Sequence, residues 1–171
     1  TNFLGNTLAE ITHNKAGIIK EKVPVIIGKM PPEASHIIGN YASQNNAPLL
    51  KNNLVSILRI RSSSLLGYEL DLIIGNKILE NIFFALRGDY QLENLATALT
   101  AIFALREKGY HINESHIRQA LGSLELPGRL EVISNKPLVI LDVAHNPHAA
   151  QALNIALEKL LPHKNKLLLC G

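Results

Sequence analysis

The sequence has one cysteine, Cys170, so it excludes an internal disulfide and fits a reducing cytosol. No apolar stretch reaches the roughly 20 residues that cross a bilayer, and no signal-peptide pattern occurs. The net charge of +3 is small, Lys and Arg are scattered, and the four Tyr and four Phe residues form no stacking ladder. We therefore expect a cytoplasmic protein that binds neither a membrane nor nucleic acid.

What the sequence does contain is enough apolar material for a core. Hydrophobic residues make up 47% of the 171 residues and charged residues 18%, which argues against disorder. This length allows one domain, or one domain and part of another. The chain opens on Thr1 without an initiator methionine and closes on Lys166–Gly171, which resembles the start of a strand. We expect an internal piece of a longer protein.

The first 48 residues predict a β-α alternation. Thr7 and Glu10 have the spacing of a capping box, which predicts a helix that begins there. Val23–Gly28 is a candidate buried strand, and a helix is expected between Pro31–Pro32 and Asn45–Asn46. Strands that alternate with helices favour a parallel sheet.

Residues 49–86 predict a small antiparallel meander. Short apolar segments alternate there with turn signals, in the order Val55–Arg61, the break Ser62–Ser64, Tyr68–Ile74, the turn Gly75–Asn76, and Ile78–Leu86.

Two helices are expected next. The first begins at Asp89, a candidate cap, and ends at Gly109, with a broad apolar stripe from Leu92 to Leu105. Asn113 is expected to cap the second helix, and the Pro127–Gly128 pair to break the pattern after it. The residues of the second helix expected to face inward are Ile117, Ala120, Leu121 and Leu124.

A turn, an apolar run and an abrupt polar stop follow one another over residues 126–148. Pro137–Leu141 is short and apolar on both faces, which predicts a strand buried in a parallel sheet. Asn146–Pro147 offers an N-cap and an N1 proline for a helix. Asp142 and His145 are therefore expected at the carboxyl end of a parallel strand, facing a helix N-terminus. Ligands bind at such places in open α/β sheets.

Four segments occur in the order and spacing of a known family, and together they are specific. The chain resembles the dihydrofolate synthase/folylpolyglutamate synthase family of the Mur ligase superfamily over nearly its whole length. The bifunctional bacterial enzymes are the most similar. The segments that carry the resemblance are Glu10–Lys20, Leu86–Asn94, Leu126–Arg129 and Asp142–Pro147.

The resemblance implies an α/β fold in three parts. Residues 1–126 would be the later part of a Mur-ligase-type P-loop ATPase domain with its meander, and residues 127–136 a hinge. Residues 137–171 would open a Rossmann-like C-terminal domain with a βαβ unit. The implied reaction is the ATP-dependent addition of L-glutamate to dihydropteroate or tetrahydrofolate through an acyl phosphate, by a monomer. The chain alone is expected to be inactive.

By the resemblance, Asn94, Arg129 and Asp142 match ATP-contacting positions. An amide can pair with an adenine edge, a guanidinium can fork onto phosphate oxygens, and a carboxylate can accept ribose hydroxyls. Without the family motifs, the alternatives are a solvated Asn94, a surface salt bridge of Arg129, and a strand-end cap by Asp142.

Lys15 matches the family's carbamylated lysine, and His145 should lie near the transferred phosphate or the incoming amine. The alternatives are an ordinary exposed lysine at a helix end and a histidine satisfied by backbone groups. The sequence has no Gly-x-x-x-x-Gly-Lys-Ser/Thr phosphate loop. We expect that loop and the ligands of Mg²⁺ before residue 1, and no metal site within the chain.

Two other functions stay open. A cell-wall precursor ligase of the same superfamily shares the lysine and the His-Asn-Pro region, although the patterns around Lys15 and Arg129 favour folate. A non-catalytic α/β nucleotide-binding module would need no phosphate loop.

Overall fold

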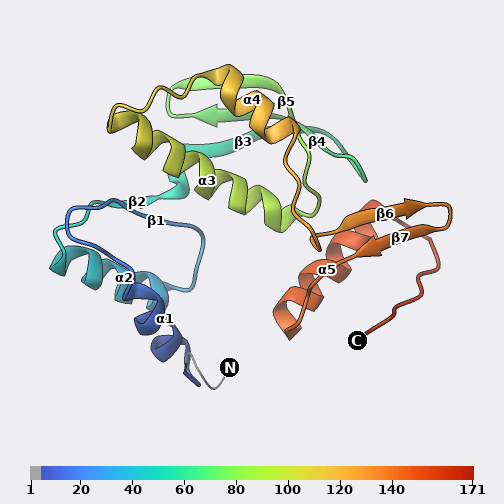
Figure 1. Ribbon diagram of the computed structural model, residues 1–171, viewed down its shortest axis with the longest axis horizontal. Helices are drawn as coiled ribbons and strands as arrows, with labels where there is room; N and C mark the ends of the chain where they lie inside the picture. Colours follow the sequence, from blue (N-terminus) through green and yellow to red (C-terminus); the bar gives the residue numbers. More distant parts are fainter. Residues whose placement is uncertain (1–4) are drawn as a thin grey trace. The chain divides into compact units, whose positions relative to one another are not determined.

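The computed structural model describes residues 5–171 and divides into two compact units. The first unit holds the described residues up to Ser56 together with Glu93–Ile112, and the second holds Ile57–Leu92 and Asn113–Gly171. The chain contains both helices and strands (Figure 1), so the predicted α/β class is confirmed. Across the described residues, no helix is both long and apolar enough to cross a membrane.

The first unit begins with the predicted capped helix α1, Leu8–Ala16. The Glu10 amide donates to Thr7 Oγ1 at 3.1 Å, and the Thr7 amide donates to Glu10 Oε2 at 3.3 Å. This reciprocal pair satisfies backbone donors that have no partner inside the helix. The capping-box prediction is confirmed.

A parallel strand pair completes the start of the first unit. Strand β1, Val25–Ile27, pairs with β2, Leu49–Lys51, and helix α2, Pro32–Gln44, connects them. The predicted β-α alternation is confirmed, with β1 shorter than expected. A short 3-10 turn, Asn52–Leu54, leads on to the meander.

Strands β3, Val55–Ser64, β4, Gly67–Ile74, and β5, Lys77–Phe84, form a three-stranded sheet in that order. The meander prediction is confirmed, but the predicted break at Ser62–Ser64 is wrong because these residues continue β3. Strand β3 lies at an edge of this sheet, where polar side chains are tolerated, and Ser62 Oγ donates to Glu69 Oε2 at 3.2 Å.

Buried side chains of this sheet and of the helix packed against it form part of the core of the second unit. Helix α4, Glu114–Gly122, packs against β5, and the Ala85 amide donates to Leu121 O at 3.0 Å. The predicted Asn113 cap is confirmed, and Ile117 and Leu121 are buried as expected. Ala120 is exposed, so its predicted inward orientation is wrong. The fully buried side chains of the sheet are Leu70, Leu72, Ile82 and Phe84.

Helix α3, Asp89–Glu107, is the long helix expected from the apolar stripe. Leu92, Leu95 and Leu99 are buried, whereas Leu105 is exposed. Asp89 was expected to cap α3. It is instead the first helical residue, and its carboxylate bonds to side chains of other elements.

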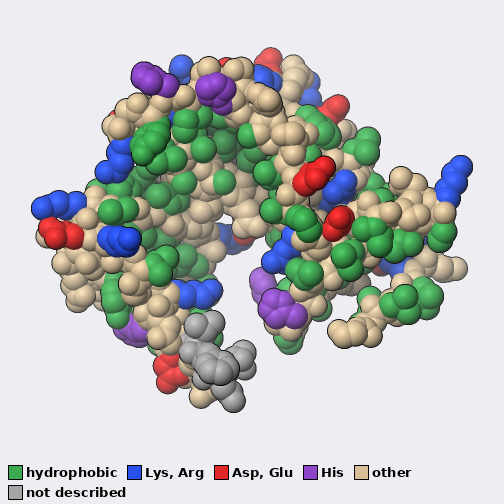
Figure 2. Space-filling view, viewed as in Figure 1, with side chains coloured by type: hydrophobic (Ala, Val, Ile, Leu, Met, Phe, Trp, Pro, Cys, Tyr) green, Lys and Arg blue, Asp and Glu red, His purple; other side chains and the backbone are tan. Residues whose placement is uncertain are grey.

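The last part of the chain differs from the prediction in its strand pairing. Strand β7, Leu138–Leu141, forms an antiparallel hairpin with β6, Glu131–Asn135, within the expected hinge, and α5, Pro147–Leu160, follows. Lys166–Gly171 forms no strand. One antiparallel neighbour and one helix cannot cover both faces of β7, so its side chains stay largely exposed. Figure 2 shows hydrophobic side chains at the surface of this part.

Candidate functional site

Arg129 lies on a sharply bent turn, residues 127–130, which we name the Arg129 turn. Gly128 has φ +68° and Leu130 has φ +48°, so both neighbours of Arg129 adopt the left-handed region. Leu130 is a non-glycine residue in that conformation, and its side chain is fully buried. The Arg129 side chain is exposed. A fixed backbone therefore presents a guanidinium to solvent.

Backbone hydrogen bonds hold the Arg129 turn against the end of β7. The Val143 amide donates to Gly128 O at 2.9 Å, and the Leu130 amide donates to Asp142 Oδ2 at 2.9 Å. From the other side, the Gly128 amide donates to Glu131 Oε2 at 2.7 Å. The predicted site residues Arg129 and Asp142 are thus brought together in the second unit.

Asp142 also holds its own loop, because the Ala144 amide donates to Oδ1 at 2.8 Å. Both carboxylate oxygens therefore accept a backbone N–H, which is the strand-end cap considered as the alternative for this residue. Each oxygen has a second lone pair that could still accept a ligand hydroxyl.

His145 stands immediately before the N-terminus of α5. Its Nδ1 lies 3.0 Å from Val143 O. A carbonyl oxygen only accepts, so Nδ1 is the donor in this hydrogen bond and Nε2 is left for another partner. Asn146 caps α5 by accepting from the Ala149 amide at 2.9 Å, with Pro147 at N1, as predicted. His145 is therefore oriented beside a helix end that favours anions.

Tyr90 belongs to the same surroundings, although its pattern in the sequence gave no reason to select it. An ideal Cβ on Gly88 would lie 2.6 Å from Tyr90 Cε1 and 3.2 Å from Leu130 Cδ1. The Tyr90 ring and the Leu130 side chain of the Arg129 turn therefore both pack against the backbone of Gly88. Burial raises the pKa of Tyr90, the negative charge of Asp142 raises it further, and the positive charge of Arg129 opposes them. The only signal in the sequence was its position inside a family motif, in the first turn of α3.

A second polar cluster ties α5 to the start of α3. Tyr68 Oη donates to Asp89 Oδ1 at 3.0 Å, and Lys159 Nζ donates to Asp89 Oδ2 at 2.5 Å. Burial raises the pKa of Asp89, but hydrogen bonds from Lys159 and Tyr68 outweigh it and hold this pKa below its usual value. Burial and the neighbouring Asp89 raise the pKa of Tyr68 strongly. The Tyr68 hydroxyl therefore stays protonated at neutral pH and donates to the Asp89 carboxylate.

The other two predicted site residues belong to the first unit. Lys15 is exposed in the last turn of α1, and Asn94 is exposed in the second turn of α3. The structure therefore groups Arg129, Asp142 and His145, and describes Lys15 and Asn94 separately.

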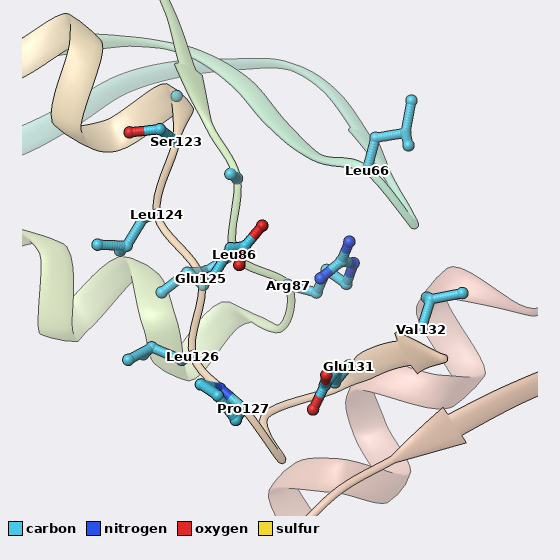
Figure 3. Close-up of a pocket in the computed structure, with 12 residues that line it drawn as sticks. Leu66, Leu86, Arg87, Ser123, Leu124, Glu125, Leu126, Pro127, Glu131 and Val132 are labelled. Carbon is cyan, nitrogen blue, oxygen red and sulfur yellow. The ribbon is translucent and has the colours of Figure 1, made fainter. Parts of the chain in front are cut away.

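A cavity of about 310 Å³ lies in the second unit, beside the linker that leads to the Arg129 turn. Figure 3 shows Arg87 reaching into the space between Leu66 and Glu131, and Pro127 on the adjoining wall. Arg87 Nε donates to Leu65 O, which fixes the base of its guanidinium. In residues 5–171, no group of three or more His, Cys, Asp or Glu side chains could hold a metal ion.

Comparisons with known proteins place this arrangement in a family. No family model matches the sequence. The dihydrofolate synthase/folylpolyglutamate synthase of Bacillus subtilis (strain 168) is 33% identical over 153 residues, 89% of this chain and 36% of that protein. The enzyme of the same name from Escherichia coli (strain K12) is 33% identical over 168 residues, 98% of this chain and 36% of that protein.

A solved FPGS–AMPPCP–folate complex, in which FPGS denotes folylpolyglutamate synthase, superimposes with a TM-score of 0.86 at 30% identity. The match covers 95% of this chain and 40% of that one. Fold and site thus define an α/β protein with the Mur ligase fold. The chain belongs to the dihydrofolate synthase/folylpolyglutamate synthase family, and it spans 36% of the length of each of these two curated relatives.

Proposed function

We propose that the protein containing this chain is a cytoplasmic, ATP-dependent ligase that adds L-glutamate to dihydropteroate, to tetrahydrofolate, or to both. A carboxylate of the acceptor attacks the γ-phosphorus of ATP, which releases ADP and forms an acyl phosphate. The amine of glutamate then attacks the acyl carbon, loses a proton, and expels phosphate to leave the amide. Such a reaction depends mainly on positioning and on charge neutralisation.

The observation that carries this proposal is the Arg129 turn. It presents an exposed guanidinium from a backbone that is hydrogen-bonded to Asp142 and Val143, the residues that lead to His145 and to the N-terminus of α5. A guanidinium and a helix N-terminus both favour phosphate oxygens. The relatives add support, because one solved FPGS binds the ATP analogue AMPPCP together with folate.

Each predicted residue has a proposed role in this reaction. Arg129 would bind phosphate oxygens, and Asp142 and Asn94 would contact the nucleoside. The Nε2 atom of His145 would face the phosphate or the incoming amine. Lys15 would act as its carbamate, an anion that helps to arrange the phosphate site. Mg²⁺ would neutralise phosphate charge in this reaction, and among residues 5–171 no group of three or more His, Cys, Asp or Glu side chains could hold it.

We also propose the domain division at residues 126 and 137. The boundary at residue 126 has local support, because α4 ends at Gly122 and the Arg129 turn precedes the β6–β7 hairpin. The boundary at residue 137 follows from the family resemblance, and it lies between two paired strands.

The test measures ATP-dependent addition of radiolabelled glutamate to dihydropteroate and to tetrahydrofolate, using the complete protein that contains this chain. We expect ligation with at least one acceptor. We also expect Arg129→Ala to lose about 2–4 kcal/mol of transition-state stabilisation, which is the range for a donor to a developing charge. Ligation of a cell-wall precursor instead, or nucleotide binding without any ligation, would refute the proposal. Activity of Arg129→Ala within twofold of wild type would refute the role of the guanidinium.

The carbamate on Lys15 has a separate test. Mass spectrometry of the native protein with and without added bicarbonate should show a carbon dioxide adduct that Lys15→Arg lacks. Lys20→Arg, in the same segment of the sequence, is the matched control and should keep the adduct. No adduct on wild type at saturating bicarbonate would refute carbamylation.

A further inference from the structure

Asp142 uses both of its carboxylate oxygens on the backbone. Oδ2 accepts the Leu130 amide at 2.9 Å, and Oδ1 accepts the Ala144 amide at 2.8 Å. Hydrogen bonds to an ionised acceptor are stronger than neutral ones. One side chain thus connects the segment that carries Arg129 with the segment that carries His145.

The Arg129 turn needs such support because of its backbone conformation. Gly128 and Leu130 flank Arg129 at φ +68° and +48°. A leucine seldom adopts a positive φ, and it keeps that conformation only where its surroundings impose it. Here the surroundings are a fully buried side chain and the bond from its amide to Asp142.

Within residues 5–171, no hydrogen bond or ion pair holds the Arg129 guanidinium itself. The part of Arg129 that these bonds hold in place is therefore its backbone, which sets the point from which the side chain extends. Asp142 fixes that backbone on one side and Glu131 on the other.

We propose that Asp142 is a positioning residue that acts through Arg129. Its carboxylate fixes the backbone of residues 128–130, so that the Arg129 side chain extends from a fixed position toward the phosphate oxygens of the nucleotide. This rests on the proposed ATP-dependent ligation. It differs from a role in which Asp142 only binds the ribose, because a ribose contact would act independently of Arg129.

A double-mutant cycle separates the two roles, because residues that act through one another give non-additive effects. The complete protein is assayed as wild type, Asp142→Asn, Arg129→Ala and the double variant, with kcat and KM for ATP measured separately. We expect Asp142→Asn alone to lower kcat/KM by about 10- to 100-fold, the loss that a misplaced group can cause. In the Arg129→Ala background, the same change should cost at least about threefold less than in wild type, because only the contact of Asp142 with the nucleoside is then lost. Equal losses in both backgrounds would overturn the proposal.

Asp71→Asn is the matched control. The Asp71 carboxylate also accepts a backbone amide, that of Asn81 at 2.9 Å, and it pairs with Arg61 at 2.8 Å in the meander. Its removal should perturb folding without any coupling to Arg129. Coupling of similar size for Asp71 and Asp142 would show a general loss of structure and overturn the positioning role.

One substitute variant and two further measurements cover the cases in which the first variant does not fold or the protein does not ligate. If Asp142→Asn does not fold, Asp142→Glu replaces it in the same cycle, with the same two outcomes. If wild type binds AMPPCP but does not ligate, the proposed ligation fails. The cycle is then measured as Kd for AMPPCP, where coupling supports the positioning role and additivity overturns it. In the free protein, Asp142→Asn should shift the Leu130 amide resonance, and an unchanged resonance would contradict the geometry.

Discussion

Gly128 is constrained twice by the fold, and its replacement by alanine should show both constraints. Its φ of +68° lies in the left-handed region. An ideal Cβ at this position would lie 2.6 Å from Val143 Cγ1 and 3.7 Å from Val143 Cβ and Cγ2. Gly128→Ala must therefore adopt an unfavourable backbone conformation and also displace a branched side chain.

The two contributions can be estimated separately. A left-handed conformation costs an alanine about 1–2 kcal/mol. Val143 is 47% exposed, so it can rotate away from the new methyl group. Leaving its preferred rotamer costs about 1 kcal/mol. We expect Gly128→Ala to lower the free energy of unfolding by about 2–3 kcal/mol in all.

Gly75 provides a matched control. It has φ +58° in the β4–β5 turn, and no atom lies within 4 Å of its ideal Cβ. Gly75→Ala should therefore cost only the conformational part, about 1–2 kcal/mol.

The assay is urea unfolding of the complete protein as wild type, both alanine variants, and Gly128→Ala combined with Val143→Ala. The second substitution removes the crowding, so the added cost of Val143→Ala should be smaller in the Gly128→Ala background than in wild type. Equal costs for the two glycines, with no coupling to Val143, would refute the contact. Because Arg129 follows Gly128, kcat/KM for ATP should fall in Gly128→Ala and stay unchanged in Gly75→Ala.

Three further predictions concern side-chain contacts. Asp89→Asn keeps an acceptor for Tyr68 and loses only a half-exposed ion pair with Lys159, so urea unfolding should show a cost below about 1 kcal/mol. Asp89→Ala also leaves the Tyr68 hydroxyl without this acceptor and should cost about 1–3 kcal/mol more, whereas equal costs would contradict the buried bond. The pKa of Asp89 is lowered in the fold, so its contribution is present above the unfolded pKa of about 3.9 and is lost as pH falls through the folded pKa. Acid titration of stability should therefore lose this component in Asp89→Asn. Thr7→Ala should cost about 1 kcal/mol by thermal unfolding, whereas Thr7→Ser should be nearly neutral.

Local signals in the sequence predicted the helices and most of the turns. The capping box of Thr7 and Glu10, the caps Asn113 and Asn146, and the Gly75–Asn76 turn all depend on residues a few positions apart. Hydrogen bonds between residues a few positions apart do not depend on the rest of the fold, so the sequence alone predicts them.

The pairing of strands with one another was not everywhere predicted correctly from the sequence. The apolar run before Asp142 fits a strand buried on both faces and also a strand of a hairpin, and only the pairing of Glu131–Asn135 with it decides. The serines Ser62–Ser64 likewise signal a break, yet they continue an edge strand. A pattern of side chains specifies which residues are apolar but not which segment lies beside them.

The site was predicted as a set of residue types, and its geometry was not. Arg129, Asp142 and His145 do lie together. A strand-end cap by Asp142 was considered only as an alternative, and the sequence did not identify the amides of Leu130 and Ala144 as its partners. The bond from the Leu130 amide accompanies the left-handed conformation of Leu130, which the neighbouring residues do not predict, whereas the bond from the Ala144 amide is a local turn contact two residues from Asp142. Tyr90 was missed because its position depends on contacts between distant segments.

The way in which the Arg129 turn is held also limits what it can do. In a glycine-rich phosphate loop, free backbone N–H groups cradle the phosphates. Here Glu131 accepts the Gly128 amide and Asp142 accepts the Leu130 amide, so carboxylates already occupy the donors on both sides of Arg129. At this turn a phosphate can therefore approach the guanidinium but not the amides of Gly128 and Leu130. The sequence also lacks the Gly-x-x-x-x-Gly-Lys-Ser/Thr pattern. In the proposed reaction, the Arg129 turn therefore contributes a single positive charge and not a cradle of backbone amides.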